Sequence, residues 1–167
     1  INMHRRLSKP LDLSQVYINN LCQIMETIVR YIIAALLIIC SSVSAEDYNL
    51  GDLTVKKSFS YPTNGRSGAG YFTLINYGTA DVLMAVTADF PRVMIHESLM
   101  QEGVMTMQHR MMVQVPGQGQ IEFSPGGYHV MFMGLTDGWA EGDEIEASLQ
   151  FKNAGTLDIK FVVIARP

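Results

Sequence analysis

The chain has 167 residues, of which 17% are charged and 48% are hydrophobic, and its formal net charge at pH 7 is −4. This composition excludes an intrinsically disordered chain and supplies enough apolar residues for one folded domain. The acidic balance makes nucleic acid and anionic lipid poor candidate partners, because both repel a negatively charged surface.

The N-terminal part of the chain has the composition of an export signal. Residues 25–45, METIVRYIIAALLIICSSVSA, contain the cation Arg30, an apolar run of ten residues at 31–40, and small residues that end at Ala45. A charged start, a short apolar segment and a small-residue cleavage site are typical of a secretory signal peptide. Residues 1–24 are polar and patternless, and we interpret them as a non-native or dispensable extension.

A membrane anchor, a core helix and a lipoprotein site are the other interpretations of this segment. A membrane-spanning helix needs about 20 apolar residues, which is twice the length of the run. Cys40 could carry a lipid, but the bulky Ile39 before it argues against that. We therefore expect cleavage after Ala45 and a periplasmic monomer that is not inserted in the membrane.

Cleavage after Ala45 leaves residues 46–167 as the mature domain. Its 8 Lys and Arg and 14 Asp and Glu give a net charge of −6. Both cysteines, Cys22 and Cys40, lie before residue 46, in the leader formed by the extension and the signal peptide. The mature domain therefore has no disulfide, no cysteine nucleophile and no thiolate metal ligand.

From residue 50 onward, short β-rich runs alternate with turn signals such as Pro-Gly, Glu-Gly and Asn-Ala-Gly. This spacing predicts an antiparallel β-sandwich or barrel, with no amphipathic helix. The expected strands are 53–61, 70–77, 81–90, 92–99, 104–115, 119–124, 128–135, 143–151 and 156–165. In the last two, alternation predicts one buried face per strand. These faces hold Ile145, Ala147, Leu149 and Phe151, and then Leu157, Ile159, Phe161 and Val163.

The middle strands carry histidine and methionine in the same period of two. In one predicted strand, Met105, Met107, His109 and Met111 share a face. In a later strand, His129, Met131 and Met133 share a face, and a third run carries His96. Methionine is usually core filler, and a single histidine on a strand is more often structural than a ligand. The concentration of all three mature histidines between 96 and 129, each near methionine, favours a metal site instead.

The donor types indicate which metal such a site would select. Thioether sulfur is soft and suits Cu(I), whereas Zn(II), Mg(II) and Ca(II) favour other ligands. Imidazole adds a stronger donor, and thioethers do not form disulfides. A His and Met site is therefore suited to carrying Cu(I) in an oxidising compartment and releasing it to a thiolate-rich acceptor.

The spacing of four of these residues, His96, Met107, His129 and Met131, is H-x10-M-x21-H-x-M. It resembles the signature of the PCuAC family of periplasmic copper chaperones. The segments "GYFTLINYG", "HESLMQEGVMTM", "SPGGYHVMFMGL" and "EGDEIEASLQFKNAGTLDIKFVV" are also similar to that family, and the resemblance covers residues 49–165.

The resemblance implies a cupredoxin-like, Greek-key β-sandwich that binds Cu(I) through His96, Met107, His129 and Met131. It also implies delivery of copper to the copper-A subunit of cytochrome c oxidase, alongside Sco-type thiol proteins. His109 and Met111 have no counterpart in the family signature.

Four other functions compete with a copper chaperone. An electron-transfer cupredoxin needs a cysteine thiolate, which the mature domain lacks. An exported β-sandwich could instead bind a protein or glycan with methionine as core, or a copper protein could store and buffer the metal. An enzyme is disfavoured because HES is not HExxH and no G-x-S-x-G is present.

Overall fold

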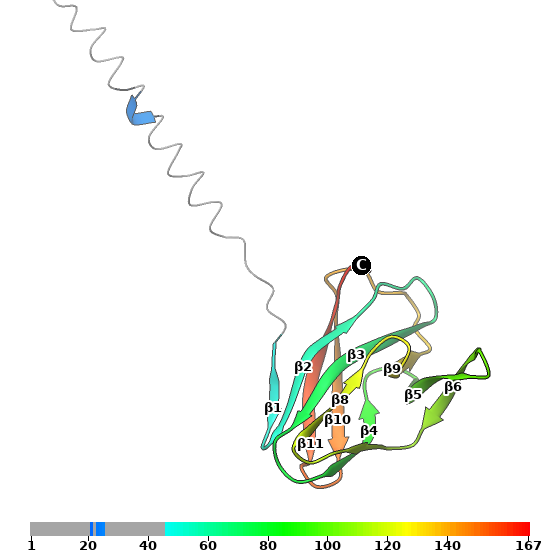
Figure 1. Cartoon of the computed structure of the whole chain (residues 1–167). Coiled ribbons are helices and arrows are strands. Elements are labelled where there is room, and N and C mark those ends of the chain that lie inside the picture. The colour runs from blue at the N-terminus through cyan, green and yellow to red at the C-terminus, as the bar shows by residue number, and fades with distance from the viewer. Residues whose placement is uncertain (1–20, 22, 26–45) are drawn as a thin grey trace, which may run out of the picture. The chain divides into compact units, whose positions relative to one another are not determined.

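A computed structural model describes residues 21, 23–25 and 46–167 of the chain (Figure 1). Residues 21 and 23–25 are helical, and the strands all belong to the compact unit Ser44–Pro167. The predicted extension and signal peptide fall almost wholly outside the described residues. No helix among the described residues has the length and apolarity needed to cross a membrane.

The described part of the mature domain consists of strands and turns. The eleven strands are β1 (Tyr48–Leu50), β2 (Leu53–Ser60), β3 (Ser67–Asn76), β4 (Asp81–Thr87), β5 (Arg92–Gln101), β6 (Val104–Arg110), β7 (Val113–Val115), β8 (Gly119–Phe123), β9 (Tyr128–Met133), β10 (Glu144–Phe151) and β11 (Thr156–Val163). Every predicted strand is present. The short strand β1 was missed, and the predicted strand 104–115 is in fact two strands, β6 and β7.

The strands form one continuous sheet in the order β6-β5-β9-β8-β3-β2-β11-β10-β4-β7, with β1 on β2 and an added pairing of β9 with β3. The sheet folds over so that β3 and β9 face β11 across the core, where Phe72 and Phe132 contact Phe161 at ring-centroid distances of 6.1 and 5.6 Å. The predicted all-β, cupredoxin-like fold is confirmed. The sheet is mixed rather than wholly antiparallel, because β11–β2 and β8–β9 pair in parallel.

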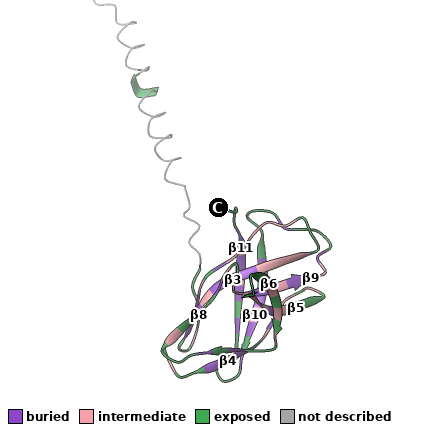
Figure 2. Cartoon of the chain, turned by 45° about the vertical axis from the view of Figure 1, so that its right-hand side comes forward, coloured by how far each residue is buried: buried purple, intermediate pink, exposed green. Residues whose placement is uncertain are grey.

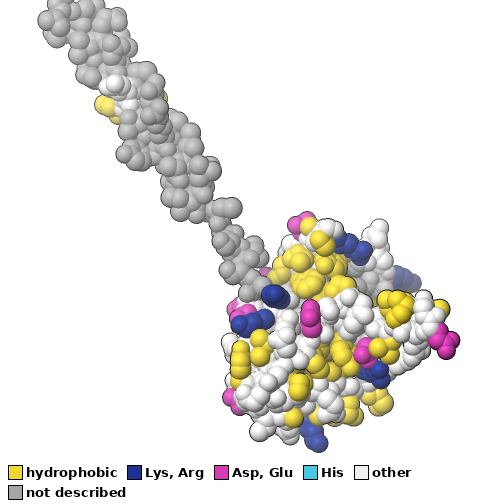
Figure 3. Space-filling model, in the orientation of Figure 1, with side chains coloured by type: hydrophobic (Ala, Val, Ile, Leu, Met, Phe, Trp, Pro, Cys, Tyr) yellow, Lys and Arg dark blue, Asp and Glu magenta, His cyan; other side chains and the backbone are white. Residues whose placement is uncertain are grey.

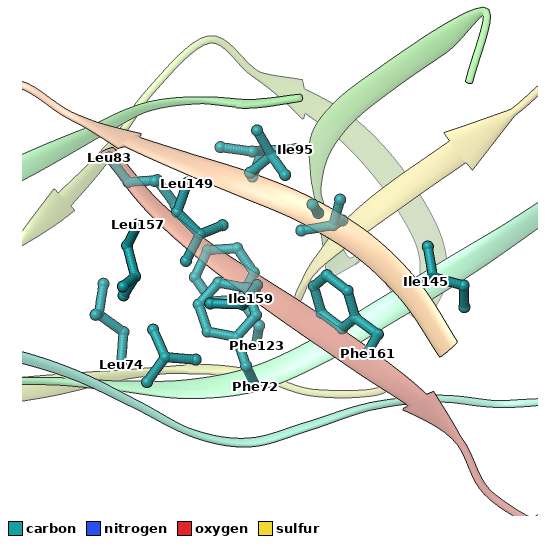
Figure 4. Close-up of a cluster of buried hydrophobic side chains, with 14 of the residues drawn as sticks. Phe72, Leu74, Leu83, Ile95, Phe123, Ile145, Leu149, Leu157, Ile159 and Phe161 are labelled. Atoms are coloured by element: carbon teal, nitrogen blue, oxygen red, sulfur yellow. The ribbon is translucent and has the colours of Figure 1, made fainter. Parts of the chain in front are cut away.

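The core lies between these two layers (Figures 2 and 4). The predicted buried faces of β10 and β11 are confirmed, since all eight of their residues are buried. Figure 4 shows Phe72 and Phe123 next to Ile159 and Leu149, and the two phenyl rings stack at 4.2 Å between centroids. Alternation of apolar and polar residues on amphipathic strands thus supplies the packed interior.

A buried carboxylate fixes the start of β4 against the turn between β10 and β11. Asp81 is 6% exposed and accepts backbone N–H bonds from Val82, Asn153 and Ala154 at 2.7, 3.0 and 2.9 Å. Burial by itself would raise the pKa of Asp81, but these donors and the charge of Lys152 hold that pKa below its ordinary value.

The hairpin of β5 and β6 projects from the sheet at the right of Figure 1. Its two-residue turn has positive φ at Glu102 (49°) and Gly103 (80°), as a type I′ turn requires. This turn sets the register in which Gln101 lies opposite Val104. Among the described strands β6 pairs with β5 alone, so it is an edge strand, and the chain leaves it at Met111 to reach β7 beside β4.

Candidate metal centre

Strand register places the three histidines of the mature domain in one row. His96 on β5 lies directly opposite His109 on β6 and His129 on β9. Residues opposite one another on paired strands point to the same face of the sheet. The ring centroid of His96 is 5.9 Å from that of His109 and 5.8 Å from that of His129. The sheet therefore carries a row of three imidazoles across three neighbouring strands.

Methionines fill the neighbouring rows of the same face. Met94 on β5 lies opposite Met131 on β9, and Met111 follows the last register pair of β6, Ile95 with Arg110, on the other side. In the opposite direction along the hairpin, Met107 lies opposite Ser98, and Met105 lies opposite Met100. The histidine row is thus bordered by thioethers on both sides, as the period of two predicted within single strands.

One contact joins the two predicted ligands of the hairpin. The Met107 sulfur lies 3.1 Å from Nδ1 of His96, so the two donor atoms converge. Met107 is 57% exposed, whereas the His96 ring is partly covered. Burial, and then the neighbouring His129 and His109, lower the pKa of His96, which keeps its imidazole neutral. A neutral imidazole is the form that binds a metal.

His129 is oriented by the backbone before β9. It is 5% exposed, and its Nδ1 lies 3.1 Å from the carbonyl oxygen of Gly127. Since a carbonyl can only accept, Nδ1 carries the proton and donates, which leaves Nε2 as the donor atom for a metal. The same carbonyl accepts the Ser98 N–H at 3.1 Å, so one turn fixes both β5 and the His129 ring.

Met131, the fourth predicted ligand, is placed by register. It stands two residues after His129 on the same face and lines a hollow of about 200 Å³ together with Tyr61, Tyr71 and Arg166. The structure therefore joins His96 to Met107 and to His129 through side-chain contacts, and it places Met131 beside His129 on the same strand face.

The methionines of the mature domain are not core filler. Among the described residues, no methionine belongs to the buried set, and the exposed large side chains include Met84, Met100, Met105, Met107, Met111 and Met112. Figure 3 shows hydrophobic side chains gathered on the projecting hairpin. Clusters of exposed apolar side chains are unfavourable in water, and on a folded domain they therefore mark interaction or ligand sites. This observation removes the main argument for a purely structural role.

Harder donors do not complete a site here. Within residues 21, 23–25 and 46–167, no group of three His, Cys, Asp or Glu side chains is arranged to hold a metal ion. Glu97, the neighbour of His96, points to the other face and is held by Arg110, whose Nε donates to its carboxylate at 2.7 Å. A metal on this face would be bound by imidazole and thioether, which is the donor set that suits Cu(I).

The arrangement of strands is that of a PCuAC domain. The chain superimposes on a copper-bound PCuAC domain from PmoF2 with a TM-score of 0.61 and 22% identity, covering 72% of this chain and 99% of that one. An apo PCuAC domain from PmoF1 also gives 0.61, with 24% identity and coverage of 72% and 100%. The resemblance inferred from the H-x10-M-x21-H-x-M spacing is thus confirmed at the level of the fold.

The family assignment is more specific. Residues 53–163 match the LpqE-like family, described as "Putative lipoprotein LpqE-like", and the chain belongs to that family. A curated relative, "Putative lipoprotein Lxx21020" of Leifsonia xyli subsp. xyli (strain CTCB07), is 31% identical over 83 residues, which cover 49% of this chain. The chain spans about half the length of this relative.

Sequence reasoning placed His109 and Met111 on one strand face with Met107, but it did not foresee that His109 lies opposite His96 or that Met94 joins this face. Periodicity had grouped His109 with Met107, but it gave no partner strand. The signal that could have placed His109 is the Glu102-Gly103 turn, because a two-residue hairpin with Gln101 opposite Val104 also sets His96 opposite His109.

Proposed function

We propose that this protein is a Cu(I) carrier of the cell envelope. The observation that carries the proposal is the face of β6, β5 and β9, where the Met107 sulfur lies 3.1 Å from a His96 ring set between two more imidazoles. All methionines of this domain lie outside its buried core. The fold shared with a copper-bound PCuAC domain supports the same conclusion.

His96, Met107, His129 and Met131 are the proposed ligands. His129 would offer Nε2, since its Nδ1 donates to Gly127, and His96 would offer a neutral ring whose pKa is lowered. The two thioethers favour the monovalent ion over Zn(II). Met107 is exposed at the edge of the sheet, so an acceptor could reach the metal from that side.

The same chemistry supports delivery rather than retention. Thiolates are stronger Cu(I) donors than thioethers, so copper should pass downhill to a thiolate site such as the copper-A subunit of cytochrome c oxidase or a Sco-type protein. Storage and buffering is the alternative. The lipoprotein description of the family supports export. The leader would be cleaved after Ala45, or Cys40 would carry a lipid, and the mass of the protein recovered from the envelope separates the two.

The test uses the full chain with Cys22→Ser and Cys40→Ser, called the cysteine-free chain, so that leader thiols bind no copper. Replacing Met107 and Met131 together by Leu should weaken the tightest Cu(I) equivalent at least tenfold, or by about 1.4 kcal/mol. The matched control, Met100→Leu with Met105→Leu, removes two exposed thioethers of the same hairpin and should leave that equivalent in place. Unaltered Cu(I) affinity in the first pair would refute the ligand assignment.

Transfer is tested by mixing the Cu(I)-loaded cysteine-free chain with a reduced, copper-free dithiolate copper domain and following the metal. Copper should move to the acceptor while this protein stays folded. Copper that remains on this protein, or moves only after unfolding, would favour storage over delivery.

A further inference from the structure

A second H-x-M motif stands opposite the proposed ligands. His109-Arg110-Met111 lies at the end of β6, and His129-Val130-Met131 lies on β9. The central strand β5 presents His96 and Met94 between them. The face is therefore nearly symmetrical about β5, with an imidazole and a thioether on either side. The PCuAC spacing takes both residues of the β9 motif but only Met107 from β6, and it leaves His109 and Met111 unassigned.

The second motif borders a hollow. Met94, His109 and Met111, joined by Met84 from β4, line a depression of about 230 Å³ on the surface. Three thioethers and one imidazole thus border one space. His109 is exposed, Met84 is 41% exposed and Met111 is 79% exposed, so neither packing nor burial accounts for their positions.

The charges around this hollow do not oppose a cation. Arg110, the residue within the second motif, also borders the hollow, but its charge is balanced because its guanidinium pairs with the Glu97 carboxylate at 2.5 Å. The hollow therefore presents soft, uncharged ligands to a metal, as a Cu(I) position requires.

We propose that His109, Met94 and Met111, with Met84 at the rim, form a second position for a soft monovalent cation, Cu(I) or its analogue Ag(I). This inference rests on the proposed function and extends it. His96 lies 5.9 Å from His109, ring to ring, so the two positions are neighbours and an ion could pass between them along the imidazole row. The second position is the more exposed, so it binds more weakly and gives copper a second route in or out, besides the one at Met107.

The test counts bound ions by native mass spectrometry on the cysteine-free chain titrated with Ag(I). Any ion held by residues before 46 is common to all variants, so the result is the difference in the number of bound ions between each variant and the cysteine-free chain. His109→Gln and Met111→Leu should each lose one equivalent and keep the tightest one within about threefold of its affinity. The control Met112→Leu removes the adjacent thioether, which does not line the hollow, and should lose none.

A direct readout accompanies the count. The methyl carbon signals of Met111 and Met94, assigned by substitution, should shift when the weaker equivalent binds and not before. If His109→Gln and Met111→Leu bind as many ions as the parent, or the Met111 methyl signal does not move, the second position is refuted. If the tightest equivalent survives Met107→Leu with Met131→Leu, the proposed function fails instead, so the two failures are distinguishable.

Discussion

Replacing Asp81 by Asn should destabilise the domain through one buried hydrogen-bond cluster. Oδ1 accepts N–H bonds from Val82 and Asn153, and Oδ2 accepts that of Ala154. The side-chain oxygen of asparagine can still accept the N–H bonds from Val82 and Asn153, but without the negative charge of the carboxylate. Its amide nitrogen would then face the Ala154 N–H, donor against donor, in a place with little access to water.

The magnitude follows from these contacts. A hydrogen bond to a charged group contributes about 1.5–3 kcal/mol, and a buried donor left without an acceptor costs about 1–3 kcal/mol. Losing one such bond, weakening two and orphaning Ala154 should lower the free energy of unfolding by about 3 kcal/mol. For a domain of this size the midpoint of thermal unfolding should fall by roughly 10–15 °C.

Urea unfolding at several pH values provides the assay. The pKa of Asp81 in the folded state is below its ordinary 3.8, so its contribution is present above that pH and is lost as the pH falls through the folded value. The gap between parent and Asp81→Asn should therefore close in acid. Asp137→Asn removes an exposed carboxylate and serves as the control. A loss for Asp81→Asn no larger than that of the control at pH 7 would refute the reasoning.

Two further predictions concern the core and the metal face. Gly70→Ala should cost about 1–3 kcal/mol of stability, because its Cβ would lie 2.7 Å from the Phe161 ring. The control, Gly65→Ala at an exposed position, should change stability by less than about 0.5 kcal/mol. Equal effects of the two substitutions in thermal unfolding would contradict this packing. Because the pKa of His96 is lowered below 6.5, the affinity for Cu(I) should stay level down to about pH 6.5 and fall only below it. In competition titrations, a decline that begins well above that pH would count against His96 as a ligand.

The parts of this structure that follow from local pattern could be predicted from the sequence. Glu144, Glu146 and Asp158 alternate with buried residues, and this fixed which faces of β10 and β11 enter the core. The end of β6 could not be predicted, because Met111 and Met112 continue the apolar run in the sequence. The strand ends there because the next residues, Val113–Val115, pair with β4 instead of β5.

The metal face divides in the same way. The period of two predicted that Met107 and His109 lie on the same face of their strand. A two-residue turn at Glu102-Gly103 implies that His96 lies opposite His109. The pairing of His96 with His129 joins residues 33 positions apart in the chain, and no local signal specifies it. Only the family spacing pointed to that partnership, and it was silent about the second H-x-M motif.

The parallel pairing of β2 with β11 also governs when the domain can fold. The Ser58 hydroxyl donates to the Lys160 carbonyl at 2.6 Å across 102 positions of the chain, so one of the first strands closes on the last. At a synthesis rate of about 5–20 residues per second, β2 waits roughly 5–20 s for its partner. During that interval β1 can cover only the start of this edge of β2, and the part at Phe59 and Ser60 is unpaired and open to other chains. Nascent chains halted before Thr156 should therefore stay unfolded and require a holding chaperone until β11 is added.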